Sequence, residues 1–323
     1  MGFGMNVQEA LLQERIDPSL TDERLSLLAR RALGERAAVR GYTVLTGGCW
    51  NRVIGIRAGG SELVVKISPN DRDKRIIREY RVLETFDRET ELPVPRPLLL
   101  DGEDGELPGT ALVMTRLPGR VMHECFGLLD RNDRSRIIDQ IAGDITALHH
   151  RRGTGFGGVE LSREERSEAW PDFWLPRFDR VIEEARASGS VPTSLIEGAR
   201  EVRPDLRPCL EIGPESTMTH YDIWAGNVMV DIHAEPPRVS GYIDVPGFYA
   251  DYARELSFAM LFGVADRGFL DTYRRDHEID EGFPLRANIY NLKMNIKHIE
   301  MYPSQSVYRH GAEDNLREIR SAL

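Results

Sequence analysis

The sequence has 323 residues, of which 41% are hydrophobic and 29% charged, so it is long enough for two lobes that each bury a core. Its net charge of -10 and isoelectric point near 5.4 argue against a nucleic-acid partner, whose phosphates require a basic surface. The chain has no long apolar run, no basic N-terminal segment and only three widely spaced cysteines, so we expect a cytoplasmic protein without membrane span, signal peptide or disulfide framework.

The first third of the chain predicts helices followed by strands. One or two amphipathic helices are expected over residues 5–40, with five leucines facing inward: Leu11, Leu12, Leu25, Leu28 and Leu33. Strands follow over residues 42–45, 52–57 and 62–68, with Gly59-Gly60 as a hairpin turn. A helix over about residues 71–87 and two further strands, the second over residues 111–115, complete a lobe of about five antiparallel strands.

The segment LPGR at residues 117–120 marks the crossing into a second lobe. Beyond it the pattern is helical, except for one hairpin over residues 227–244. We therefore predict an α+β fold with an N-terminal nucleotide-binding lobe over residues 1–117 and a helical C-terminal lobe over residues 118–323.

The first candidate site combines a glycine-rich turn, a lysine and a glutamate. Gly47 and Gly48 would let the backbone approach phosphates closely. Only four of the 42 basic residues are lysines, and Lys66 lies in the apolar strand LVVKI, where an ammonium group needs a partner. Glu79 in the following helix is the expected partner, as in kinases that hold the α- and β-phosphates of ATP. The alternative is an edge-strand lysine that reaches water and a solvated glutamate.

The second candidate site is the segment MTHYDIWAGNVMVD, which contains His220, Asp222 and Asn227. It matches the H-x-D-x-x-x-x-N form of a kinase catalytic loop, in which the aspartate accepts the proton of the attacking hydroxyl. Asn227 enters the predicted hairpin and Asp244 leaves it at the same open end, so two oxygen ligands for Mg²⁺ would converge. His220 would fix the loop through hydrogen bonds, and a purely structural role for all of these residues is the alternative.

Together these sites predict a protein-kinase-like fold that binds ATP and Mg²⁺. Asp244 is followed almost at once by a helical pattern, with no A-P-E motif and no room for a peptide platform. We therefore expect a small hydroxyl-bearing substrate, for which a cationic compound would suit the negative net charge. Two alternatives are a nucleotide-binding regulatory module without transfer activity and, less favoured, a protein kinase.

The chain resembles the aminoglycoside phosphotransferase and fructosamine kinase superfamily from Thr43 to its C-terminus. The family pattern G-G-x-x-N appears here as residues 47–51, which adds Asn51 to the nucleotide site, and the motifs around Lys66 and Asp222 follow in family order. The phrase LVMTRLPG is similar to the aminoglycoside phosphotransferase hinge and implies adenine contacts near Thr115 and Leu117. The stretch DIWAGNV and the aromatic C-terminal helices are similar to fructosamine kinases. The resemblance implies phosphorylation of a ketoamine, an aminoglycoside or another small hydroxyl compound.

Two positions depart from the family pattern and bear on the substrate pocket. Tyr221 replaces the glycine of H-G-D, and Glu255 replaces the aspartate of the segment after the metal site. Asp251 and Glu255 are candidates to attract an amine, although Glu255 could instead support the catalytic loop. The His149-His150-Arg151-Arg152 run is interpreted as a basic helix end, and the acidic run 276–281 as a solvated loop.

Overall fold

The computed structural model describes residues 20–34, 37–45, 51–68, 74–102, 105–107 and 109–323. The chain divides into two compact units. The first unit comprises residues 1–120, 229–231 and 240–245, and the second comprises the intervening residues and the C-terminal region to Leu323. The N-terminal unit thus extends to Arg120 and includes two short segments from later in the chain.

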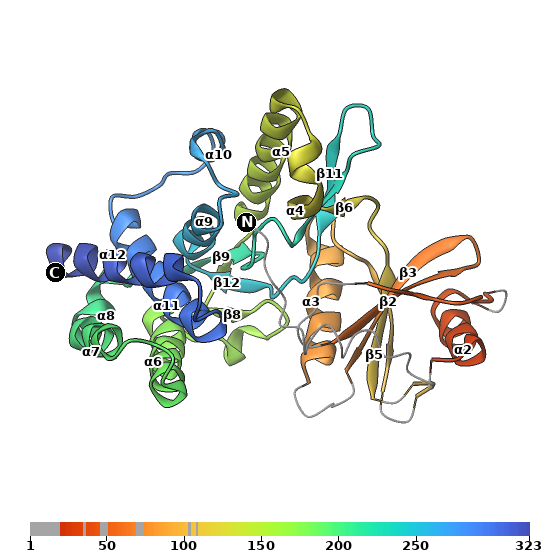
Figure 1. Cartoon of the computed structure of the whole chain (residues 1–323), viewed down its shortest axis with the longest axis horizontal. Coiled ribbons are helices and arrows are strands. Elements are labelled where there is room, and N and C mark those ends of the chain that lie inside the picture. Colours follow the sequence, from red (N-terminus) through yellow and green to blue (C-terminus); the bar gives the residue numbers. More distant parts are fainter. Residues whose placement is uncertain (1–19, 35–36, 46–50, 69–73, 103–104, 108) are drawn as a thin grey trace. The chain divides into compact units, whose positions relative to one another are not determined.

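The first unit contains a five-stranded antiparallel sheet in the order β1-β2-β3-β5-β4 (Figure 1). Gly59 and Gly60 form the turn between β2 and β3 with φ of 59° and 85°, a left-handed conformation that glycine adopts without steric cost. The predicted strands are therefore present: β1 (Thr43–Val44), β2 (Arg52–Ala58), β3 (Ser61–Ser68), β4 (Pro97–Asp101) and β5 (Thr110–Thr115).

Helices α2 (Asp22–Leu33) and α3 (Arg75–Glu89) lie on opposite faces of this sheet (Figure 1). Leu25 and Leu28 of α2 share one core with alternate residues of β3, such as Val65. The described part of the N-terminal segment therefore covers the sheet. Leu33 is 39% exposed, so its predicted inward position is wrong. Leu11, Leu12 and the start of the helix expected over residues 71–87 lie outside the described residues.

The second unit is mainly helical, as predicted. Helix α11 packs against α12, α9 and α6, and α5 packs against α10. No helix in the described ranges is long and apolar enough to cross a membrane. The helices are α4 (Met122–Cys125), α5 (Arg131–His149), α6 (Trp170–Ser188), α7 (Thr193–Val202), α8 (Leu206–Cys209), α9 (Tyr252–Leu261), α10 (Arg267–Tyr273), α11 (Phe283–Met301) and α12 (Ser306–Ala322), with short 3-10 turns at residues 126–128, 163–165 and 203–205.

The expectation of a single hairpin beyond residue 118 is wrong, because the second unit also contains a four-stranded sheet. Its order is β7-β9-β12-β8, and its strands are β7 (Arg152–Thr154), β8 (Gly157–Gly158), β9 (Glu215–Thr219) and β12 (Phe248–Ala250). Strands of two to five residues, two of them rich in glycine, carry too little alternation to be recognised in a sequence. The predicted hairpin is formed by β10 (Val228–Asp231) and β11 (Arg238–Tyr242), which β6 (Arg120–Val121) extends in the order β11-β10-β6.

Candidate active site

The first unit brings Lys66 together with two carboxylates. Lys66 Nζ lies 2.6 Å from Glu79 Oε1, the predicted strand–helix ion pair, and also contacts Asp244 Oδ1. Because side chains alternate along a strand, Lys66 projects from the face opposite Val65 and Ile67, which belong to the core shared with α2. Burial alone would lower the pKa of Lys66, but the adjacent carboxylates raise it above its ordinary value. The lysine therefore stays charged at neutral pH.

Asp244 follows strand β11, which is hydrogen-bonded to the segment before β4 and to the segment after β5. Tyr242 N donates to Pro93 O at 2.8 Å, and Ser240 Oγ donates to Pro118 O at 2.5 Å. Gly241 has a φ of 149°, and a Cβ there would lie 2.4 Å from Pro93 O, so a side chain would not fit. Asp244 itself has a φ of 53°, a left-handed conformation that is uncommon for residues other than glycine.

The remaining predicted nucleotide-binding residues are placed as follows. Gly47 and Gly48 lie outside the described residues. Asn51 directly precedes β2 and is partly buried. Thr115 ends β5, where its hydroxyl accepts a 2.9 Å hydrogen bond from Arg96 N, and Leu117 packs beside Gly241. Adenine contacts by Thr115 and Leu117 stay a prediction.

In the second unit, the catalytic-loop segment follows β9 directly. Register pairs Thr219 with Phe248 of β12, and Gly247 N donates to His220 O at 3.2 Å. His220 is fully buried, and its Nδ1 accepts a 3.2 Å bond from Asp222 N, so its predicted structural role is confirmed.

The side chains of Asp222 and Asn227, predicted as proton acceptor and metal ligand, contact each other. Asn227 Nδ2 donates to Asp222 Oδ2 at 2.8 Å and to Asp222 O at 3.0 Å. Both hydrogen bonds use the amide nitrogen, which leaves the Asn227 carbonyl oxygen as an acceptor of the kind that Mg²⁺ prefers. Asp222 is a partly exposed carboxylate, suited to receive a proton. The convergence of Asn227 and Asp244 on one ion stays a prediction.

Tyr221 takes the place of the family glycine at a position where the backbone favours glycine. Its φ is 80°, in the left-handed region. The ring lies 4.4 Å from that of Phe248, and the Arg254 guanidinium stacks over it at 4.0 Å. Tyr221 N donates to a carboxylate oxygen of Glu255. These contacts hold the bulky residue in the strained conformation directly before Asp222.

Glu255 is 1% exposed and supports the catalytic loop by accepting a hydrogen bond from Tyr221 N. Its second oxygen lies 2.8 Å from His149 Nε2, and His149 Nδ1 lies 2.8 Å from the Tyr273 hydroxyl. Burial alone would raise the pKa of Glu255, but hydrogen bonding to His149 and the nearby His220 and Tyr221 N keep it below its ordinary value. The idea that Glu255 attracts an amine is therefore wrong, and its loop-supporting alternative is confirmed.

Asp251 is likewise not available to a substrate. It is 1% exposed, accepts 2.7 and 2.6 Å bonds from Arg286 Nε and the Tyr290 hydroxyl, and caps α9 through Ala253 N. Asp251 therefore ties α9 to α11. Among the acidic run, Asp280 is paired with Arg286, whereas Asp276, Glu278 and Glu281 are exposed.

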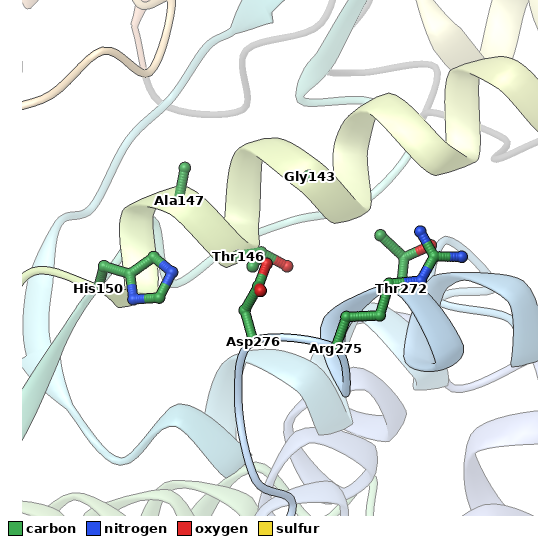
Figure 2. A pocket seen from close by; sticks show the side chains of 7 residues that line it. All are labelled: Gly143, Thr146, Ala147, His150, Thr272, Arg275 and Asp276. Atoms are coloured by element: carbon green, nitrogen blue, oxygen red, sulfur yellow. The ribbon is translucent and has the colours of Figure 1, made fainter.

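The histidine–arginine run ends α5 as predicted, with Arg151 and Arg152 exposed beyond the last turn, but its two histidines have further contacts. His149 is fully buried against Glu255, as described above. His150 lines a pocket between α5 and the segment after α10, together with Thr146, Arg275 and Asp276 (Figure 2). None of the residues that line this pocket belongs to the catalytic loop.

Sequence reasoning missed His149 and Arg254, which both act on the catalytic loop. Arg254 is 6% exposed, and its Nη1 donates to Tyr221 O at 2.9 Å. His149 and Glu255 are 106 positions apart, and Arg254 and Tyr221 are 33 apart. No local pattern connects such residues, although the position of Arg254 beside Glu255 in the helix after Asp244 is a signal that could have been used.

Comparisons with known proteins agree on one family. The sequence model described as the phosphotransferase enzyme family matches residues 41–281. A probable ketoamine kinase of Synechocystis is 22% identical over 270 residues, which cover 80% of this chain and 83% of that protein. A candidate fructosamine-3-kinase of Thermobifida fusca has a similar structure, with a TM-score of 0.71 at 18% identity over 92% of this chain and 98% of that one.

A second group of solved structures shares the fold. A thermostable mutant of an aminoglycoside phosphotransferase, in a ternary complex with ADP and hygromycin B, gives a TM-score of 0.65 at 15% identity over 92% of this chain and 98% of that one. The predicted two-lobed, protein-kinase-like fold is confirmed by these neighbours.

Proposed function

This chain belongs to the phosphotransferase enzyme family, and we propose that it transfers the γ-phosphoryl group of ATP to a hydroxyl of a ketoamine. The observation that carries the proposal is the catalytic loop, where Asn227 and the buried Glu255 hold the partly exposed Asp222 and its neighbour Tyr221 in place. A ketoamine is preferred as acceptor because the Synechocystis relative, at 22% identity, is a probable ketoamine kinase.

In the proposed reaction the acceptor hydroxyl oxygen bonds to the γ-phosphorus while the bond from that phosphorus to the bridging oxygen of ADP breaks. The hydroxyl proton passes to the Asp222 carboxylate. Asn227 orients this carboxylate through the 2.8 Å bond to Oδ2. Transfer in line needs little covalent chemistry from the protein, so positioning and charge stabilisation dominate.

Lys66 holds the α- and β-phosphates in this proposal. Glu79 fixes the ammonium group at 2.6 Å, and the pair of carboxylates keeps it protonated. Mg²⁺ supplies positive charge to the phosphates when it is bound. The Asn227 amide oxygen and the Asp244 carboxylate, whose side chain is 44% exposed, have the donor chemistry that this ion requires.

An aminoglycoside is the second candidate acceptor, supported by the fold shared with the hygromycin B complex. A regulatory module that binds nucleotide without transfer is the third possibility. It would retain ATP binding but release no ADP in the presence of any acceptor.

The test compares wild type, Asp222→Asn and Asp139→Asn. Asp139 is an exposed residue of α5 and serves as the matched control. With Mg-ATP and a ketoamine or an aminoglycoside, we expect Asp222→Asn to reduce turnover by about 10²- to 10⁴-fold and to leave ATP affinity within about twofold. The control should match wild type. Undiminished turnover in Asp222→Asn would refute the assigned role.

A further inference from the structure

Three arginines of the second unit lie near Lys293, and one of them contacts the catalytic loop. We call Arg177 and Arg180 of α6, Arg254 of α9 and Lys293 of α11 the basic cluster. The gathering is unexpected in a chain with a net charge of -10 and only four lysines.

Contacts between α6 and α11 locate Lys293. The rings of Trp174 and Tyr290 lie 5.2 Å apart, and Glu184 accepts a 3.1 Å bond from Lys297 Nζ. Lys293 lies between these two contacts along α11, so it faces the part of α6 that carries Arg177 and Arg180. Its ammonium group lies 5.6 Å from the centre of the Trp174 ring.

Arg254 connects this cluster to the catalytic loop. Its guanidinium stacks over the Tyr221 ring at 4.0 Å and donates to Tyr221 O at 2.9 Å. On its other side it contacts the sulfur of Met294 at 3.8 Å, next to Lys293 in sequence. The basic cluster therefore begins one residue from the proposed proton acceptor Asp222.

A second path of contacts joins the same two regions. The Arg177 guanidinium stacks over the Phe173 ring at 3.6 Å, and Phe173 lies 5.7 Å from Phe248. Phe248 in turn packs against Tyr221 at 4.4 Å. Three successive aromatic rings thus connect Arg177 with Arg254 at the catalytic loop.

Three members of the basic cluster have no carboxylate partner in the described part of the chain: Arg180, Arg254 and Lys293. Arg254, although buried, bonds to a carbonyl and a thioether, and no described carboxylate pairs with it. Within the described ranges, neither Arg180 nor Lys293 forms a hydrogen bond or an ion pair, and Glu184 is engaged by Lys297. Like charges held close together repel one another, and an anion bound among them would offset this repulsion.

The surroundings of Lys293 would favour an anion beside its ammonium group. Burial, together with Arg254, Arg177 and Arg180, lowers its pKa to about 7, and Glu184 offsets this only in part. An anion beside the ammonium group would restore its charge at neutral pH.

We propose that the basic cluster binds an anionic group, a carboxylate or a phosphate, on the hydroxyl compound that receives the phosphoryl group. The inference rests on the proposed function and narrows its substrate class to anionic ketoamines, such as the ketoamine of a free amino acid. It departs from the expectation of a cationic substrate, because like charges would repel a polycationic aminoglycoside from this surface.

The test uses three ketoamines of the same sugar, formed from glycine, glycinamide and phosphoethanolamine. They differ in carrying a carboxylate, a neutral amide or a phosphate. Steady-state kinetics with Mg-ATP are measured for wild type, Lys293→Met and Arg180→Gln. Lys297→Met is the matched control, because Lys297 lies one turn further along α11 and is already paired with Glu184 and Glu300.

We expect KM for the better anionic ketoamine to lie at least about 10-fold below KM for the amide. Lys293→Met and Arg180→Gln should each raise KM for the anionic compounds by about 10-fold, with little effect on the amide. Lys297→Met should behave as wild type. Equal KM values for charged and neutral ketoamines, or an equal effect of Lys297→Met, would overturn the proposal.

Calorimetric measurement of ketoamine binding separates this inference from the proposed function. If none of the three ketoamines is phosphorylated, the proposed function fails, while binding of the same compounds still decides the role of the basic cluster. Binding of the anionic ketoamines in preference to the amide, lost in Lys293→Met, would support the anion site. Absence of such a preference would refute it.

Discussion

Replacing Lys66 by methionine removes the ammonium group that two carboxylates surround in the first unit. The side chains of Lys66 and Glu79 are 11% and 17% exposed, so their 2.6 Å ion pair is poorly screened by water. At an effective dielectric constant near 20 its Coulomb energy is about 6 kcal/mol, before the cost of removing both charges from water. Asp244 is 44% exposed and contributes less. We expect Lys66→Met to lower the free energy of unfolding by about 3 kcal/mol.

Urea denaturation with Lys297→Met as control measures this effect. Lys297 also contacts two carboxylates, but its side chain is 35% exposed, so its loss should cost less than about 1 kcal/mol. Adding Glu79→Gln to Lys66→Met should recover about 1 kcal/mol, because it removes a carboxylate left without its partner. If Lys66→Met destabilised the chain no more than Lys297→Met, the argument that Lys66 is held by a buried pair would be refuted.

Three further predictions concern the second unit. Glu255→Gln should lower the free energy of unfolding, measured by urea denaturation, by about 2 kcal/mol, because it weakens the charge-assisted bonds to His149 and Tyr221. Since the pKa of Glu255 is lowered in the fold, this stabilisation should be present above pH 4.5 and be lost as the pH falls further. Tyr221→Ala should be less stable than Tyr221→Gly by about 1 kcal/mol, because alanine keeps the left-handed strain at φ 80° whereas glycine relieves it; equal unfolding midpoints would contradict this. KM for an anionic ketoamine should rise between pH 6 and pH 8 as Lys293, with a pKa near 7, loses its proton, and this rise should disappear in Lys293→Met.

Residues tied to a local pattern were predicted well from the sequence. Lys66 interrupts an apolar strand, and Glu79 lies in the helix that follows it, so both the strand pattern and the kinase motif indicated the pair. The spacing of His220, Asp222 and Asn227 predicted that these three residues belong to one loop. In the structure Asp222 is hydrogen-bonded to both His220 and Asn227. Such motifs can be recognised in a sequence because all of their residues lie within a short stretch of chain.

Residues that depend on tertiary contacts could not be predicted in the same way. His149 contacts Glu255 across two helices that are far apart in sequence. Lys293 of α11 likewise lies near the arginines of α6. Asp251 and Glu255 follow the metal motif closely and therefore looked accessible, yet both are buried because α9 packs against α11 and β9. Proximity in sequence to a motif did not indicate exposure.

The most direct test of the account is the product itself. The chain is incubated with Mg-ATP and the ketoamine of glycine, and the acceptor and ADP are quantified by mass spectrometry, with Asp222→Asn as the blank. We predict one phosphoryl group added to the ketoamine for each ADP formed, and almost none with Asp222→Asn. Tight ATP binding with neither ketoamine nor aminoglycoside phosphorylated would contradict the account and would favour a regulatory nucleotide-binding module.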